Sequence, residues 1–437
     1  MTSEELEGVL QAAKAKATPR TREELLAAAR ELFARAEADG TAFKDLGVSL
    51  RNVMAEGEGE AVPPAFRTYT TEEALHELWE MWKSNDPPVS TGLAQLDAVM
   101  AGGLRAGDVI AVAGSAKGGK SAFAGGIAYA AAKWRGPDGQ RAVVAYASVE
   151  MPAYEVNARW VAAEMYRLRR EELAAELLKR KPRKPEELAR HVSFTEVLYG
   201  GAWRGEGVGL LHQADVKQRL TAARERVAKN DNLTVTRLPP GSTAHTLREL
   251  VLDRRQGEQK PPALTVLVID PIQRFYAAEQ GALAGRTLDA ANSNETERMS
   301  IVSQQVKELA DELGLAVLFT SDGTKASAGG GLSSAQSLRG SYHLNHLATT
   351  IMGIRTGKEK EDLAEKLGSG DEKSGADSLQ ELLNQHKPWK SDDPSERERL
   401  GERLAFVDMS GHRRGPATDM IFRFVPGAMT FAEPDPT

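Results

Sequence analysis

Residues 114–121 read GSAKGGKS, and this spacing of glycine, lysine and serine is typical of a loop that binds phosphates. Such a loop wraps backbone N–H groups around a polyphosphate, and the N-terminus of the following helix adds partial positive charge. Lys120 is expected to reach the β- and γ-phosphates, while the Ser121 hydroxyl binds Mg²⁺. The candidate nucleotide-binding residues of the loop are Gly114, Ser115, Ala116, Lys117, Gly118, Gly119, Lys120 and Ser121.

Two carboxylates are candidates for the other parts of a hydrolytic nucleotide site. Asp270 ends the apolar run LTVLVID, where an aspartate can hold Mg²⁺. Glu150 follows the run AVVAYASV and is a candidate base for an attacking water, with an exposed loop carboxylate as the alternative interpretation. Because the carboxyl ends of neighbouring parallel strands converge on one crevice, we expect Lys120, Glu150 and Asp270 to lie together. ATP is the default nucleotide.

The elements that must position these residues predict an α/β fold. From residue 89 onward, short β-branched runs alternate with helical segments, as in a mostly parallel sheet that is buried on both faces. The run DVIAVAG predicts a strand before the phosphate loop, and KSAFAGGIAYAAAKW predicts a helix after it. This strand–loop–helix context is the one that a phosphate-binding loop requires.

Three parts of the chain are distinguished by composition. Residues 1–55 predict a small helical region, because apolar residues recur every three or four positions. Residues 56–85 resemble a linker with a short docking helix, whose two tryptophans indicate packing on its own domain or on a neighbouring subunit. Residues 86–437 form the predicted ATPase domain, with charged insertions at about 163–232 and 357–402.

Composition limits the classes of partner and compartment. The net charge of -6 argues against a protein that coats nucleic acid by bulk charge, but it does not exclude a local basic channel. The chain has no cysteine, which excludes disulfides and thiolate metal sites and fits a reducing cytoplasm. No apolar run reaches the length that spans a membrane, so we expect a soluble cytoplasmic protein.

The order of several motifs resembles the RecA-type ATPase domain of DnaB-like replicative helicases. The matching segments lie within residues 86–437, less the two insertions, and include GSAKGGKS, SVEMP, LVIDPIQ, NETERMSIVSQQVKELADELGLAVLFTS and GHRRGP. The resemblance implies an α/β, RecA-like P-loop core that uses ATP and Mg²⁺. It also implies a homo-oligomer, most simply a hexameric ring, that acts on single-stranded DNA during DNA replication.

The same resemblance implies roles for individual residues. Glu150 would polarise the attacking water, Gln273 matches the glutamine after the magnesium-binding acid, and Arg413 matches an arginine finger. Such a finger enters the neighbouring subunit's site, which would then be complete only at a subunit interface. The sequence departs from the family at Asp322, where a glutamine that senses the γ-phosphate is usual, and at Gly411, where a basic residue is usual.

Two segments rich in small residues, 275–294 and 323–340, are candidate pore loops that hold single-stranded DNA by its phosphates. Ordinary surface loops are the alternative. The basic residues in or beside these segments are Arg274, Arg286, Lys325 and Arg339. Their small number, together with the acidic balance and Asp322, favours a second hypothesis, a nucleotide-switched assembly or regulatory ATPase without helicase activity. In either case, the N-terminal helices are expected to recruit a protein partner.

Overall fold

The computed structural model divides the chain into two compact units, Met1–Asn85 and Asp86–Thr437. The residues that it describes are 70–84, 87–115, 117–179, 191–200, 213–256, 262–277, 292, 294–322, 347–357, 400–412 and 418–433. The helices expected within residues 1–55, and most of the insertion expected at 357–402, lie outside these described residues.

In the first unit, the described element is the helix α4 (Thr71–Ser84), which coincides with the predicted docking helix. A capping box starts it: the Glu73 backbone N–H donates to the Thr70 hydroxyl over 3.2 Å, and the Thr70 backbone N–H donates to Glu73 Oε2 over 2.7 Å. Leu75 and Trp79 of this helix are exposed. Two large apolar side chains one helical turn apart are thus solvent-exposed on α4.

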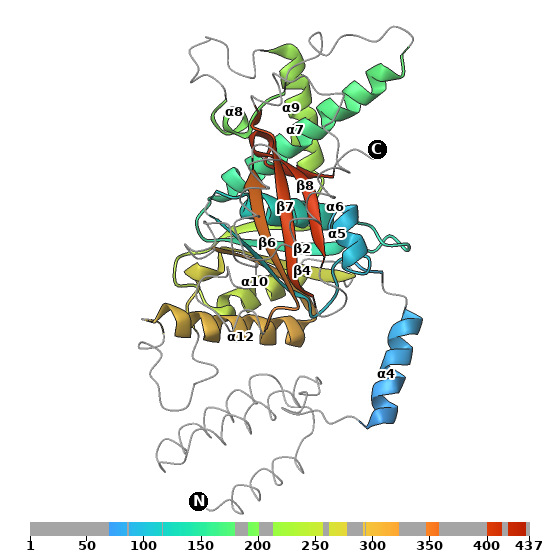
Figure 1. Ribbon diagram of the computed structural model, residues 1–437, viewed down its shortest axis with the longest axis vertical. Coiled ribbons are helices and arrows are strands. Elements are labelled where there is room, and N and C mark those ends of the chain that lie inside the picture. Colours follow the sequence, from blue (N-terminus) through green and yellow to red (C-terminus); the bar gives the residue numbers. More distant parts are fainter. Residues whose placement is uncertain are drawn as a thin grey trace, which may run out of the picture. The chain divides into compact units, whose positions relative to one another are not determined.

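The second unit is built on a nine-stranded sheet with the order β3-β2-β4-β5-β1-β6-β7-β8-β9 (Figure 1). Strands β3 to β6 in this order pair in parallel, and the pairs from β6 to β9 are antiparallel. The prediction of a mostly parallel sheet is confirmed. The strands are β1 (Val109–Gly114), β2 (Ala142–Ser148), β3 (Leu233–Arg237), β4 (Leu264–Asp270), β5 (Leu315–Asp322), β6 (Thr350–Gly357), β7 (Arg403–His412), β8 (Asp419–Val425) and β9 (Thr430–Ala432).

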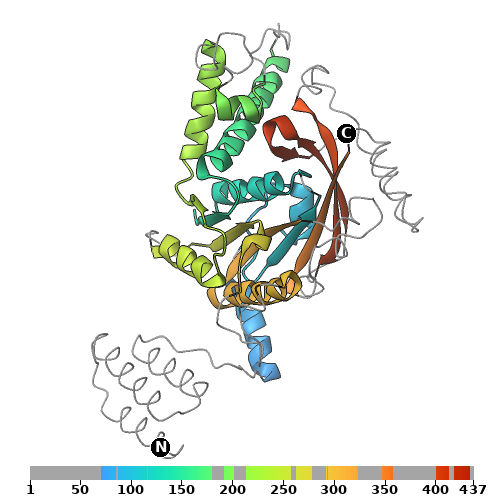
Figure 2. The same cartoon turned by 90° about the vertical axis from the view of Figure 1, so that its left-hand side faces the viewer.

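Helices cover both faces of this sheet. Alternate residues of β1 enter opposite cores: Ile110 and Val112 pack with α6 (Lys120–Lys133), whereas Ala111 and Ala113 pack with α10 (Ala244–Gln256) and α12 (Glu295–Leu313). Figures 1 and 2 show α6 on the face opposite α12. Burial on both faces explains why the central strands are continuous apolar runs.

A helical projection lies beside the sheet, at the top of Figure 1. It comprises α7 (Ala153–Leu177), α8 (Phe194–Tyr199) and α9 (Ala214–Ala228), which share a small core around Met165, Val192 and Val216. The long helix α7 starts directly after the SVEMP segment, so it ties the projection to the predicted nucleotide site. None of the helices in the described residues combines the length and the apolar character needed to cross a bilayer.

Candidate active site

Strand register brings the predicted site residues to one edge of the sheet. Gly114 at the end of β1 pairs with Asp322 at the end of β5, and Ser148 at the end of β2 pairs with Asp270 at the end of β4. Glu150 lies just beyond Ser148. In a parallel sheet these carboxyl ends face the same crevice, which is where α/β proteins bind ligands.

Two glycines of the phosphate loop lie where a residue with a side chain would be strained or would clash. Gly119 adopts φ 94°, a conformation that residues with a side chain rarely adopt. A Cβ atom on Gly119 would lie 3.1 Å from the ring of Phe431 and 3.2 Å from that of Phe424. A Cβ atom on Gly114 would lie 2.9 Å from the Ile354 carbonyl oxygen. The helix α6 therefore starts close to the sheet, with its N-terminus at the crevice.

Lys120 is buried at the start of α6, and its ammonium group is held within the loop. Its Nζ donates to the carbonyl oxygens of Gly114 and Ser115 over 3.0 and 2.8 Å. The same Nζ lies 3.0 Å from Oδ1 of Asp322. Asp322 thus forms an ion pair with the lysine that is expected to bind the phosphates.

Asp270 is a buried carboxylate that is surrounded by hydroxyl groups. Ser121 donates its hydroxyl to Oδ1 over 3.0 Å, Thr320 donates to the same oxygen, and Tyr146 donates to Oδ2 over 2.6 Å. Burial, and after it the Asp270 charge, raise the pKa of Tyr146 well above its usual range, so Tyr146 stays a donor.

The pair formed by Ser121 and Asp270 fits Mg²⁺, which prefers oxygen ligands and usually takes only one or two from the protein. Within the described residues, no three histidine, cysteine, aspartate or glutamate side chains group into a metal site. Phosphate oxygens and water would therefore have to supply the remaining magnesium ligands.

Glu150 forms an exposed ion pair with Arg274, the last residue of the short helix η4 (Ile272–Arg274). The Nη2 atom of Arg274 lies 2.7 Å from Oε1 of Glu150. Arg274 was singled out in the sequence as a basic residue beside a candidate DNA loop. The structure places its guanidinium on the candidate catalytic carboxylate, and its contact with nucleic acid stays a prediction.

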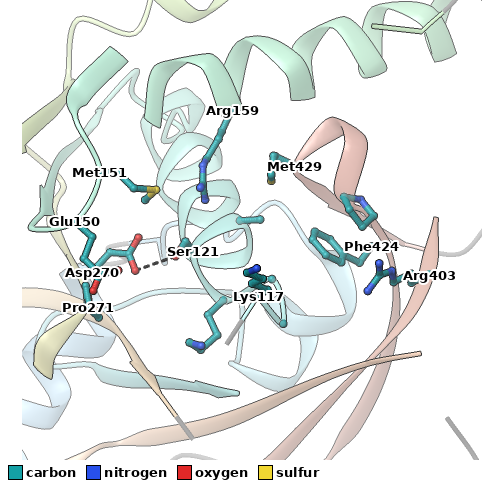
Figure 3. Close-up of a pocket in the computed structure, with 15 residues that line it drawn as sticks. Lys117, Ser121, Glu150, Met151, Arg159, Asp270, Pro271, Arg403, Phe424 and Met429 are labelled. Atoms are coloured by element: carbon teal, nitrogen blue, oxygen red, sulfur yellow. Dashed lines mark hydrogen bonds between the residues drawn. The ribbon is translucent and has the colours of Figure 1, made fainter. Parts of the chain in front are cut away.

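A cavity of about 470 Å³ joins these residues (Figure 3). Its lining includes the phosphate loop from Lys117 to Ser121, together with Glu150 and Asp270. This volume is typical of small-molecule sites. The structure thus brings four of the predicted site residues, Lys120, Ser121, Asp270 and Glu150, to one cavity.

Arg159 also lines the cavity, although the sequence analysis did not identify it. It extends from α7 toward Ser121 in Figure 3, while its Nη2 lies 3.4 Å from Oε1 of Glu155. Its Nε atom is buried and has no hydrogen-bond partner in the described part of the chain. Nothing in the spacing of SVEMPAYEVNAR distinguishes this arginine from a surface one, because only the direction of α7 turns it inward.

Another wall of the cavity, next to the phosphate loop, comes from the C-terminal strands. Phe424 of β8, with Pro426 and Met429 just beyond it, forms an apolar surface, and Arg403 of β7 lies beside them. Phe424 stacks on Phe431 of β9, with ring centroids 4.6 Å apart. An apolar wall beside a phosphate loop suits a flat, weakly polar group such as a nucleobase.

The remaining predicted residues do not line the cavity or lie outside the described residues. The side-chain amide of Gln273 donates to Ser321 Oγ over 2.6 Å, so Gln273 links η4 to β5, and it is not part of the cavity wall. Other candidates lie outside the described residues, so nothing is added about their positions, namely Ala116, Arg286, Lys325, Arg339 and Arg413.

Comparisons with known proteins agree with this geometry. Residues 88–197 match the family model described as the DnaB-like helicase C-terminal domain. A solved structure of a DnaB-like replicative helicase and its interactions with primase is 16% identical, with a TM-score of 0.54, and the match covers 94% of this chain and 76% of that chain. The ATPase domain of G40P is 17% identical, with a TM-score of 0.55, and the match covers 84% of this chain and 99% of that chain.

No curated protein matches the chain. At these identities, the solved structures establish a shared fold, and the family model adds the segment that carries the phosphate loop, Glu150 and Arg159. Over residues 88–197 the chain is therefore similar to the DnaB-like helicase C-terminal domain family, and its second unit has a RecA-like fold.

Proposed function

We propose that this protein is a DnaB-like ring motor that hydrolyses ATP to translocate along single-stranded DNA or to unwind a duplex. The observation that carries the proposal is the convergence of Lys120, Ser121, Asp270 and Glu150 on one cavity. Three of these side chains are the parts that phosphoryl transfer requires, and the fourth, Glu150, is a carboxylate suited to orienting water.

In the proposed site, the backbone N–H groups of the loop and the Lys120 ammonium bind the β- and γ-phosphates. Ser121 and Asp270 hold Mg²⁺, which when bound neutralises charge on the phosphate oxygens. Arg159 extends into the same cavity, where its cationic group adds to the charge that faces a triphosphate. The base rests against the wall formed by Phe424, Pro426 and Met429.

Hydrolysis requires a water molecule in line with the bond between the γ-phosphorus and the bridging oxygen. Glu150 orients this water and accepts its proton as the new phosphorus–oxygen bond forms and the bridging bond breaks. The products are ADP and phosphate. The protein's contribution is mainly positioning and electrostatic stabilisation, since no covalent intermediate is needed.

We further propose that the active form is a hexamer in which Arg413 of one subunit completes the site of the next. The exposed apolar side chains of α4 are consistent with contact between subunits. Mixing Lys120→Ala subunits with Arg413→Ala subunits tests this claim. Shared sites should restore part of the ATPase activity, and no recovery in an assembled mixture would contradict the role of Arg413.

Contact with DNA is proposed for the segments that follow β4 and β5, with Arg274, Arg286, Lys325 and Arg339 as the phosphate-binding residues. ATPase activity measured with and without single-stranded DNA over a range of salt concentrations tests this proposal. Phosphate contacts are strongest at low salt, so stimulation should be largest there. A lack of stimulation at low salt would refute the motor function.

A nucleotide-switched assembly or regulatory ATPase remains the second candidate. It is favoured by the ion pair between Lys120 and Asp322, because a carboxylate replaces the glutamine through which the family senses the γ-phosphate. This alternative predicts ATP-dependent assembly with a low hydrolysis rate that DNA does not change. Its proposed partner is a protein bound by the N-terminal helices, and light scattering with and without ATP would detect the assembly.

A further inference from the structure

The contact between Arg274 and Glu150 has an asymmetric geometry. The Nε and Nη2 atoms of Arg274 lie 2.8 and 2.7 Å from one oxygen, Oε1 of Glu150. Within the described residues, the second oxygen, Oε2, forms no hydrogen bond. The guanidinium therefore fixes the carboxylate through one oxygen and leaves the other available to accept a proton from water.

Both partners extend from anchored backbone. Arg274 ends η4, its carbonyl oxygen accepts a hydrogen bond from the Gly241 N–H over 3.3 Å, and the next residue, Phe275, is buried in the core. On one side of Glu150, Val149 is buried. On the other side, the Met151 N–H donates to Ser148 Oγ over 3.0 Å. The two backbone segments thus hold the side chains within reach of each other.

Stability does not explain this pair. The Arg274 and Glu150 side chains are 58% and 51% exposed, and ion pairs between exposed groups contribute little to the free energy of unfolding. An unrestrained glutamate at this exposure would sample several rotamers, of which only some orient a carboxylate oxygen toward an attacking water. A partner that selects one orientation acts on the rate of hydrolysis rather than on the fold.

We propose that Arg274 is a positioning residue for nucleotide hydrolysis, which holds Glu150 so that Oε2 faces the water it activates. This inference rests on the proposed ATPase activity of the same site. Arg274 is not part of the cavity wall, so it acts through Glu150 and not through contact with the nucleotide. A catalytic rate constant that falls without a change in ATP affinity is the expected signature.

The test compares purified full-length variants in a steady-state ATPase assay without DNA, so that a contact of Arg274 with nucleic acid cannot contribute. Arg274→Ala should lower kcat about tenfold and leave KM for ATP within about twofold. Arg274→Lys should recover part of this loss, because it restores a cation with a single nitrogen in place of the planar guanidinium.

Arg248→Ala is a matched control, since Arg248 forms an exposed pair of equal length, 2.7 Å, with Glu312 between α10 and α12. It should leave kcat unchanged. Thermal unfolding of Arg274→Ala and of this control should be alike, which separates an effect on positioning from an effect on folding.

A second comparison places Arg274→Ala in a Glu150→Gln background. If Arg274 acts through the Glu150 carboxylate, the double variant should hydrolyse ATP no more slowly than Glu150→Gln alone. An unchanged or raised kcat in Arg274→Ala, or an additional loss in the double variant, would overturn the inference. An absence of hydrolysis in the unmodified protein would instead overturn the proposed ATPase activity, before any Arg274 variant is compared.

Discussion

Replacing Asp322 with asparagine is expected to strengthen ATP binding. Oδ1 of Asp322 lies 3.0 Å from Nζ of Lys120, the ammonium that a bound triphosphate needs. Nucleotide binding must therefore break this ion pair, and it brings phosphate oxygens toward a carboxylate of like charge. Asparagine keeps the size of the side chain and removes the charge, so it relieves both costs.

The expected gain in ATP affinity depends on how exposed Asp322 and Lys120 are to solvent. The Asp322 side chain is 50% exposed, whereas that of Lys120 is 9% exposed. A pair with one exposed partner contributes up to about 1 kcal/mol, which corresponds to about a fivefold change in Kd. Repulsion between Asp322 and the phosphates acts in the same direction. Because salt screens such interactions over about 8 Å at physiological ionic strength, the gain should shrink at high salt.

Calorimetric titration with a non-hydrolysable ATP analogue and with ADP, at low and high salt, measures this effect. Asp322→Asn should lower Kd for the ATP analogue about fivefold at low salt. The ADP affinity should change less if Asp322 faces the γ-phosphate. Asp311→Asn is a control, because it removes an exposed carboxylate that pairs with Lys307 on α12. Unchanged or weaker ATP binding in Asp322→Asn would refute the reasoning.

Four further substitutions test the packing and the charges of the fold. Gly119→Ala should destabilise the protein by about 1–2 kcal/mol in urea unfolding, because the φ of Gly119 is 94°. Gly126→Ala, inside α6, should instead stabilise the protein by about 0.5–1 kcal/mol, because alanine favours a helix interior. Equal effects of the two substitutions would contradict this account. Tyr146→Phe removes a buried O–H donor to the Asp270 carboxylate, so the free energy of unfolding should fall by about 1.5–3 kcal/mol in the same assay. An unchanged free energy of unfolding would show that this hydrogen bond does not stabilise the fold. Desolvation and the facing Asp408 raise the pKa of Asp419 to about 6, so its ionisation should cost stability as pH rises from about 4 to 6. Asp419→Asn should remove this part of the pH dependence in thermal unfolding, and an unchanged profile would contradict the assignment.

The apolar runs DVIAVAG, AVVAYASV and LTVLVID that the sequence analysis identifies form β1, β2 and β4. The apolar runs do not include β3, β8 and β9, and two of these strands show why apolar runs do not reveal every strand. β3 (Leu233–Arg237) lies at the edge of the sheet and has no buried residue, so it lacks an apolar run. β8 (Asp419–Val425) contains the charged residue Arg423, which interrupts its apolar run. Arg423 is nevertheless buried, and its charge is paired with Glu402, 2.9 Å from the guanidinium.

The gathering of Lys120, Ser121, Asp270 and Glu150 followed from the sequence, because the topology of a parallel sheet sends the carboxyl ends of adjacent strands to one edge. The sequence did not predict the other side chains that line the cavity. Arg159 enters the cavity through the direction of α7, and the cavity wall at Phe424 comes from strands near the C-terminus.

By itself, the sequence determined the α/β class, the phosphate loop and the acids that accompany it, since each depends on local spacing or on a rule of sheet topology. Only the tertiary structure decided which charges neutralise one another. Arg274 on Glu150 and Asp322 on Lys120 are contacts between segments far apart in the chain, and an ion pair forms only within a few ångströms. No local pattern encodes such distances, because they depend on the packing of the whole sheet edge.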